Sequence, residues 1–138
     1  MSFVPIKQDN VQLLKDFIDH MGIAAESFRY FNSRSTDVIT NHLVTLLIVE
    51  NSKPVAYGHL DTEDGAVWLG VCILPPFIGK GYGKKMMNEL MRTAKEMDVL
   101  KIQLTVDKEN KNAIALYEKF NFKREREFEN YFQYSVEF

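Results

Sequence analysis

The chain has 138 residues, 46% hydrophobic and 26% charged, so it is long enough to bury a core and is expected to form one domain over residues 1–138. Its formal net charge of -2 argues against nucleic acid or an anionic membrane as the main partner. The single cysteine, Cys72, excludes an internal disulfide, and the histidines lack the spacing of a metal site. Without a recognisable leader or membrane-spanning stretch, the sequence predicts a cytoplasmic protein that holds no metal.

Hydrophobic periodicity divides the first half of the chain into strands and helices. The run "FVPIK" predicts a short strand, and Asp9 or Asn10 can cap a helix whose apolar residues continue at helical spacing to Gly22. A second, weaker helical segment is expected over residues 24–42. The runs "LVTLLIVE", "PVAYGHLD" and "AVWLGVCIL" then predict strands joined by short turns, which is typical of an antiparallel meander.

The second half alternates between helices and strands. A helix with a methionine-rich apolar face precedes the strand "LKIQLTV", the helix "NKNAIALYEKF" and two closing strands, "FKREREF" and "YFQYSVEF". The element order βααβββαβαββ predicts an α/β (α+β) fold, with a mixed, mostly antiparallel sheet of about six to seven strands flanked by about four helices. Trp68 and the methionine face, which includes Met86 and Met87, are expected to lie in the core.

The stretch "ILPPFIGKGYGKKMM" (residues 73–87) connects a predicted strand to a predicted helix through three alternate glycines. Unsatisfied N–H groups at a helix start, together with the close approach that glycine permits, predict a phosphate site, and Lys80, Lys84 and Lys85 add positive charge. A Walker loop needs Ser or Thr after Gly83-Lys84, and a dinucleotide fingerprint needs glycine at Lys84, so kinase, NTPase and dehydrogenase functions are excluded. A plain glycine turn with solvated lysines is the alternative.

The segment "ILPPFIGKGYG" resembles the coenzyme A loop of the GNAT superfamily of N-acetyltransferases, and "NKNAIALYEKFNF" is similar to that superfamily's second signature. The two segments stand in the family's order, one strand and one helix apart, and the element order agrees over essentially the whole chain. The family usually has glutamine or arginine where this chain has Ile78, and glycine where it has Asn121. Asparagine tolerates the left-handed conformation that is expected after a helix.

The resemblance implies acetyl-CoA as the acyl donor and a primary amine as the acceptor, which attacks directly in a ternary complex. The amine belongs to a small molecule, an amino sugar or a peptide α-amine. The resemblance also implies that main-chain groups of Val71, Cys72 and Ile73 pair with the pantetheine arm, that Asn110 contacts the coenzyme, and that Tyr117 donates a proton to its sulfur. The residues that it places around the pyrophosphate are Gly79, Lys80, Gly81, Tyr82, Gly83 and Lys84.

The transfer chemistry itself supports a proton donor such as Tyr117. An amine that attacks a thioester expels a thiolate, and proton transfer from a phenol near pKa 10 to a thiolate near 8.5 is uphill by only about 2 kcal/mol. The base is less evident, because the flanking strands hold no glutamate and Thr105 occupies the slot most familiar from the family. His59 and Asp61 share one face of "PVAYGHLD" and are the candidate bases; solvated residues at a strand end are the equally weighted alternative.

The missing glutamate favours an acceptor of low basicity. A lysine-like amine of pKa about 10.4 loses roughly 4 kcal/mol on becoming neutral near pH 7.5, whereas an α-amine of pKa about 7.8 loses almost nothing. Acceptor specificity is expected in "AAESFRYFNSRS", where Arg29 and Tyr30 are candidate substrate residues and, with equal weight, plain surface groups. Phe28 and Phe31 are expected to pack inward.

Two other functions stay open on the sequence. A non-catalytic module of the same fold would bind coenzyme A or an acyl-CoA, which the hydrophobic Ile78 and the missing glutamate favour and Tyr117 opposes. A plain interaction domain would pair its terminal strands with another subunit. A homodimer through those strands is compatible with every one of these functions.

Overall fold

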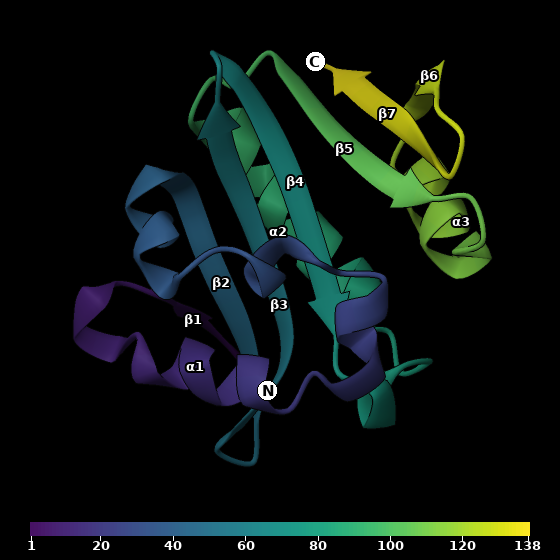
Figure 1. Ribbon diagram of the computed structural model, residues 1–138. Helices are drawn as coiled ribbons and strands as arrows, with labels where there is room; N and C mark the ends of the chain where they lie inside the picture. The colour runs from purple at the N-terminus through teal and green to yellow at the C-terminus, as the bar shows by residue number, and fades with distance from the viewer.

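The computed structural model describes all residues, from Met1 to Phe138, and contains a seven-stranded sheet with the order β1-β2-β3-β4-β5-β7-β6 (Figure 1). Only β4 and β5 pair in parallel. The strands are β1 (Ser2–Pro5), β2 (His42–Glu50), β3 (Lys53–Glu63), β4 (Ala66–Ile73), β5 (Lys101–Asp107), β6 (Lys123–Glu127) and β7 (Tyr131–Glu137). The helices are α1 (Gln12–Asp19), α2 (Tyr82–Glu96) and α3 (Lys111–Lys119). Short 3₁₀ helices are η1 (Gln8–Asn10), η2 (Gly22–Glu26), η3 (Tyr30–Asn32), η4 (Thr36–Asn41) and η5 (Pro75–Phe77).

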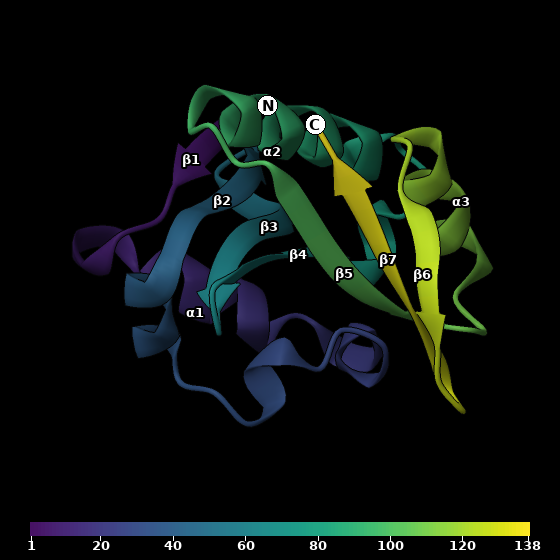
Figure 2. The same cartoon turned by 90° about the horizontal axis from the view of Figure 1, so that it is seen from above.

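Helices cover both faces of the sheet, as the view from above shows (Figure 2). α2 and α3 lie on one face, and α1 with the segment from η2 to η4 lies on the other. The predicted apolar face of α2 is buried and belongs to a cluster of 20 buried hydrophobic residues, whereas α1 contributes Leu14 and Phe17 to a separate cluster of nine. The sheet therefore separates a larger core from a smaller one.

The predicted mixed, mostly antiparallel sheet is confirmed, and so are the strands and helices after residue 42. The prediction of a helix over residues 24–42 is wrong, because the short 3₁₀ helices η2, η3 and η4 take its place. Ser and Asn side chains compete for backbone hydrogen bonds; Ser35 Oγ, for example, accepts from Asp37 N at 3.3 Å as the N-cap of η4, and so starts a separate turn inside the predicted helix. Asn10 does not cap α1 as expected, since its Oδ1 accepts from Lys7 N at 2.7 Å.

The sheet ends in a charged edge strand. All five residues of β6, "KRERE", are exposed and charged. Charged side chains on an edge strand oppose pairing with a second sheet, because strand addition would bring their charges together and desolvate them.

None of the helices combines the length and the apolar character needed to cross a lipid bilayer.

The strands β4 and β5 separate soon after they meet. Their ladder holds one residue pair, Trp68 with Gln103, and beyond this point the two strands diverge (Figure 1). From Leu69 to Ile73, β4 therefore pairs with β3 alone. Main-chain groups that a continuous sheet would use are left facing the gap, beside the end of β4 where the glycine loop and α2 begin.

Truncating Phe17 to alanine is expected to lower the free energy of unfolding by about 3–5 kcal/mol, the range for a buried phenylalanine. Phe17 is fully buried on α1, with its ring centroid 5.9 Å from that of Tyr57. Urea unfolding measures the loss. The control is Leu100→Ala, at a side chain that is 76% exposed, with an expected change within about 0.5 kcal/mol. Equal losses in the two variants would contradict the packing of α1 on the smaller core.

Candidate active site

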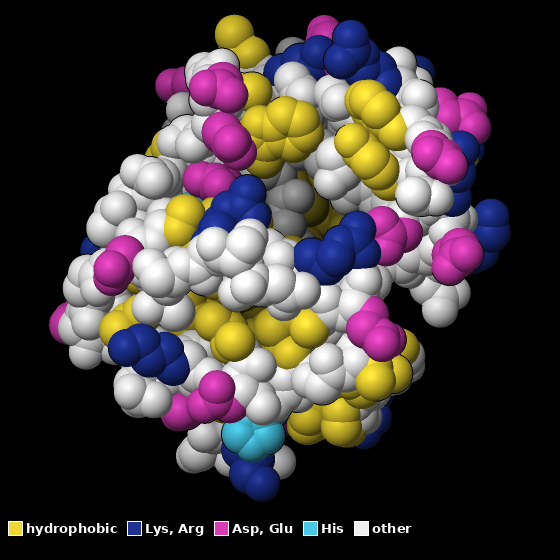
Figure 3. All heavy atoms as spheres, viewed as in Figure 1, with side chains coloured by type: hydrophobic (Ala, Val, Ile, Leu, Met, Phe, Trp, Pro, Cys, Tyr) yellow, Lys and Arg dark blue, Asp and Glu magenta, His cyan; other side chains and the backbone are white.

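A cleft of about 810 Å³ opens where β4 and β5 separate. Figure 3 shows a hollow on this face, with hydrophobic and basic side chains at its rim. The cleft brings together nine of the site residues predicted from the sequence: Arg29, Tyr30, His59, Asp61, Val71, Cys72, Ile73, Asn110 and Tyr117. Thr105 also lines it, whereas the predicted glycine-loop residues 79–84 lie beyond it, next to Ile78 at its edge.

The glycine loop has the conformation and the space that an anion site needs. Gly79 and Gly81 have φ angles of +83° and +86°, and a Cβ at either position would meet no atom within 4 Å. Gly81 is the N-cap residue of α2 and has no side chain to cap it, so the first N–H groups of the helix stay available to a ligand. Lys80 and Lys84 form no ion pair with a carboxylate. The Tyr82 side chain is buried and its hydroxyl donates to Glu50 at 2.7 Å, which leaves its main chain for a ligand.

Tyr117 lies in the wall of the cleft, on α3. The Asn110 side chain caps this helix by accepting from Ala113 N at 3.3 Å, and Tyr117 follows two turns later. Burial, with a smaller contribution from nearby Cys72, raises the pKa of Tyr117 to about 12, so the phenol remains protonated at neutral pH. Burial also raises the pKa of Cys72 to about 12, which keeps this thiol from acting as a thiolate nucleophile.

His59 belongs to a row of polar side chains on the cleft-facing side of β3. In the register of β3 and β4, Tyr57, His59 and Asp61 stand opposite Cys72, Gly70 and Trp68. The His59 ring packs over Gly70, where an added Cβ would lie 2.6 Å from Nε2, and its Nδ1 lies 2.5 Å from the Tyr57 hydroxyl. Burial, then His42 and Arg34, lower the pKa of His59 well below its usual value, so the ring is neutral at pH 7. The alternative of a solvated residue at a strand end is wrong for His59, because its side chain is buried and β3 continues to Glu63.

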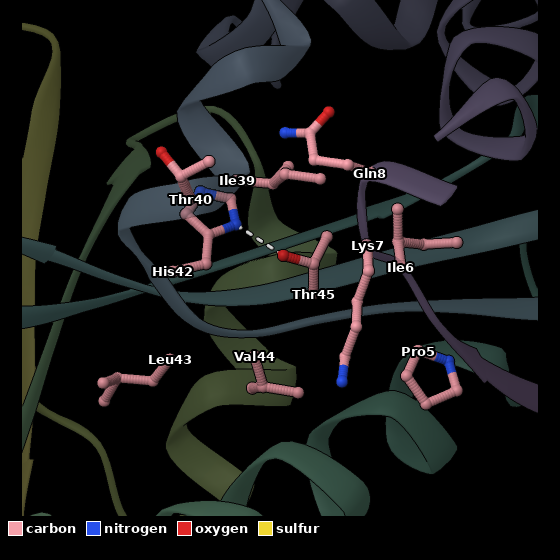
Figure 4. A pocket seen from close by; sticks show the side chains of 10 residues that line it. All are labelled: Pro5, Ile6, Lys7, Gln8, Ile39, Thr40, His42, Leu43, Val44 and Thr45. Carbon is pink, nitrogen blue, oxygen red and sulfur yellow. Dashed lines mark hydrogen bonds between the residues drawn. The ribbon is translucent and has the colours of Figure 1, made fainter. Parts of the chain in front are cut away.

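Asp61 is buried as well, with an exposed fraction of 5%, so the alternative of a solvated carboxylate is also wrong. Its Oδ2 accepts from the Tyr30 hydroxyl at 2.7 Å, and its Oδ1 has no hydrogen-bond partner in the protein. The Tyr30 hydroxyl also lies 2.7 Å from His42 Nε2, and His42 Nδ1 lies 2.8 Å from Thr45 Oγ1. Figure 4 shows this last contact in a second pocket, of about 300 Å³, between β1, η4 and β2.

Arginines from the η2–η4 segment overhang the cleft. Arg29 forms two hydrogen bonds with Asp107, at 2.8 and 3.0 Å, and so ties this segment to the end of β5. Its guanidinium, a candidate substrate group, is thus engaged within the protein. Arg34 lies over the Tyr30 ring, with Cζ 4.4 Å from the centroid, and has no carboxylate partner. Trp68, expected in the core, is half-buried and lines the cleft.

Comparison with known proteins decides the family. The model of the acetyltransferase (GNAT) family matches residues 12–122. The chain belongs to the GNAT family. No group of three or more His, Cys, Asp or Glu side chains in this GNAT protein is arranged to hold a metal ion.

Individual relatives are distant. The [ribosomal protein bS18]-alanine N-acetyltransferase of Haemophilus influenzae is 32% identical over 80 residues, which span 57% of this GNAT chain and 54%, about half, of that protein. The PaiA N-acetyltransferase of Thermoplasma acidophilum, solved in complex with coenzyme A, superposes with a TM-score of 0.76 at 18% identity, covering 100% of both chains. The GNAT domain of S. lividans PAT has a TM-score of 0.81 at 14% identity, covering 99% of this chain and 89% of that one. These structures confirm the GNAT fold.

Sequence reasoning missed the buried partners of Asp61 in this GNAT protein. His42 and Thr45 belong to β2, whose register places His42 opposite Asp61 and Thr45 opposite His59. The available signal was Thr45, a polar residue inside the apolar run "HLVTLLIVE". A polar residue in such a run indicates a hydrogen bond, but its partner depends on the strand register.

Proposed function

We propose that this GNAT protein transfers the acetyl group of acetyl-CoA to a primary amine by direct attack in a ternary complex. One observation carries the proposal: a buried, protonated Tyr117 lies in the wall of the cleft that the separating β4 and β5 strands open. The name of the Haemophilus influenzae relative, an alanine N-acetyltransferase, supports an amine as acceptor.

The coenzyme would be held mainly by the main chain. The free edge of β4 over Val71, Cys72 and Ile73 offers amide and carbonyl groups to the pantetheine arm, as an added strand would use them. The uncapped start of α2, the open side of the Gly81 turn and the unpaired lysines suit the pyrophosphate. Because most of these contacts come from backbone groups, Ile78 at the cleft edge is compatible with them.

The chemistry assigned to the chain is proton handling and orientation. The amine nitrogen forms a bond to the acetyl carbon as the carbon–sulfur bond breaks, and the leaving sulfur takes a proton from Tyr117. An acceptor that enters as an ammonium gives up two protons, of which one restores Tyr117 and the other leaves with solvent. His59 and Asp61, on the same face of β3, are the candidate bases for these protons.

The acceptor best suited to this site is an amine that is partly neutral at pH 7.5, such as an α-amine or an amino sugar. The lowered pKa of His59 makes its imidazole a weak base. A weak base is sufficient to deprotonate an α-amine of pKa about 7.8, whereas a lysine side chain of pKa about 10.4 needs a stronger base. Faster turnover of a lysine peptide than of glycinamide or glucosamine would contradict this acceptor class.

Excess acetyl-CoA is expected to raise the unfolding temperature by about 5–10 °C, because a ligand at a hundredfold its Kd adds about 2.7 kcal/mol to the stability of the native state. Differential scanning fluorimetry measures the rise, and release of free thiol in the presence of amines measures transfer. Lys84→Ala should reduce the temperature rise, whereas Lys15→Ala, an exposed change on α1, should preserve it. A shift without turnover of any amine would favour a coenzyme-binding module; no shift would overturn the proposal.

A further inference from the structure

The Asp61 carboxylate has one oxygen that the protein leaves without a donor. Asp61 lines the cleft and is buried, yet no N–H or O–H group of the chain bonds Oδ1. The nearest basic nitrogen, His42 Nε2, lies 3.9 Å away, beyond hydrogen-bond distance. Buried polar oxygens are nearly always hydrogen-bonded, and a buried charge is costly unless it is paired. Oδ1 is therefore an unused acceptor on a side chain that lines the cleft, and the oxygen itself has almost no accessible surface.

The hydrogen bonds behind Asp61 all run toward it. Because the single Tyr30 hydroxyl proton is donated to Asp61 Oδ2, the hydroxyl oxygen must accept from His42 Nε2–H. Burial lowers the pKa of His42, so its ring is neutral and Nδ1 is left to accept from Thr45. The direction is thus Thr45 to His42 to Tyr30 to Asp61. This series of hydrogen bonds holds the carboxylate in place, occupies Oδ2 and leaves Oδ1 without a donor.

The group that fits Oδ1 is a cation with N–H donors. His42 is neutral, and Arg29 is engaged by Asp107, so neither supplies a charge to Asp61. An ammonium group has three donors and a full positive charge, and it matches a carboxylate oxygen in a low-dielectric site. The Trp68 side chain, opposite Asp61 in the register of β4, adds an aromatic surface suited to the alkyl part of such a ligand.

We propose that Asp61 Oδ1 binds the ammonium group of the acetyl acceptor, which therefore enters the cleft as a primary alkylammonium cation. His42 and Thr45 are positioning residues that act through Tyr30 and do not touch the acceptor. The inference rests on the proposed function, since it names the form in which that function's acceptor binds. It places the amine on the same face of β3 as His59.

The test compares amines with hydroxyl analogues of nearly the same shape. Titration calorimetry with coenzyme A present measures Kd for glycinamide against glycolamide and for glucosamine against glucose. The wild type should bind each amine at least about tenfold more tightly than its analogue, since a hydrogen bond to a charged group contributes a factor of about 10–100. Asp61→Asn should remove this preference, while Asp64→Asn, in an exposed turn where asparagine suits the positive φ, should keep it.

A second variant separates binding from folding. Thr45→Val keeps the shape of the side chain and removes the donor to His42 Nδ1. It should reduce the amine-to-hydroxyl preference several-fold, a ratio that general destabilisation does not change. Acetyl-CoA should raise the unfolding temperature of Asp61→Asn and of Thr45→Val by as much as it raises that of the wild type.

Each outcome bears on the inference. Equal amine preference in the wild type and Asp61→Asn, or no amine binding by the wild type, overturns the ammonium site. Release of thiol from acetyl-CoA with these amines tests the proposed function separately. If the wild type releases thiol and Asp61→Asn keeps the preference for amines over hydroxyl analogues, the proposed function stands and the ammonium site is rejected. If amine binding depends on Asp61 but no thiol is released, the ammonium site stands and the proposed function is rejected.

Discussion

Replacing Tyr117 by phenylalanine is expected to lower kcat by about 10²- to 10³-fold and to leave acetyl-CoA binding unchanged. The change removes one oxygen from a buried ring and keeps its packing against Phe122, at 6.1 Å between centroids. Without the phenol, the leaving sulfur has no proton donor among the groups assigned to it. A coenzyme-binding module would show the same temperature rise with acetyl-CoA and would have no turnover to lose.

Steady-state kinetics of thiol release, together with the acetyl-CoA temperature shift, measures both halves of this prediction. Tyr131→Phe is the matched control, because that ring lies at the exposed start of β7, outside the cleft. Wild-type kcat in Tyr117→Phe would reject the proton-donor role. The pH profile gives a further check: with a pKa of about 12, Tyr117 stays protonated through pH 10, so its ionisation should cause no alkaline decline in kcat below about pH 10.

Gly70→Ala is expected to lower kcat/KM by at least tenfold and the free energy of unfolding by about 1–3 kcal/mol, the range for overpacking. The new Cβ would lie 2.6 Å from two atoms of the His59 ring and 3.1 Å from Phe28 Cε1. The ring has little room to retreat, since its Nδ1 contacts the Tyr57 hydroxyl. The imidazole must therefore move out of its position on the face of β3 that lines the cleft.

Gly58→Ala is the matched control for Gly70→Ala. It adds a methyl group to the neighbouring strand on the opposite face, where Met86 Sδ would lie 2.5 Å from the new Cβ. The flexible side chain of Met86, on the buried face of α2, can adjust, and it lies in the larger core, outside the cleft. Urea unfolding gives the stability of each variant, and thiol release gives its kcat/KM. Equal kcat/KM for the two variants would show that the position of His59 does not matter for turnover.

The fold was predictable wherever hydrophobic periods were long and turn signals clear. The meander from β2 to β4 and the helices α2 and α3 follow from such patterns. The segment over residues 24–42 was not, because its weak helical period is interrupted by polar residues and tertiary contacts select 3₁₀ turns. Arg29 illustrates these contacts, since its bonds to Asp107 join residues 78 positions apart in the chain.

The site was predictable where residues that act together lie close in sequence. The glycine loop and the helix that carries Asn110 and Tyr117 are local motifs, and the roles of these residues, which the resemblance to the GNAT superfamily implies, stay predictions. The surroundings of Asp61 were not predictable. Tyr30 contacts His42 and Asp61 across 12 and 31 positions of the chain, and a shift of one residue in the register of β2 and β3 would turn these side chains to the other face.

The two parts of the cleft rest on different cores on opposite faces of the sheet, so they can change independently in evolution. The predicted proton donor Tyr117 and the helix α2, which the glycine loop begins, belong to the cluster of 20 buried residues, while the η2–η4 segment that overhangs the cleft packs on the cluster of nine. Loops on a rigid scaffold accept substitutions at little cost, and distant sites contribute independently to stability. Under the proposed function, changes in the η2–η4 segment would therefore alter the choice of amine while the proposed coenzyme site keeps its geometry.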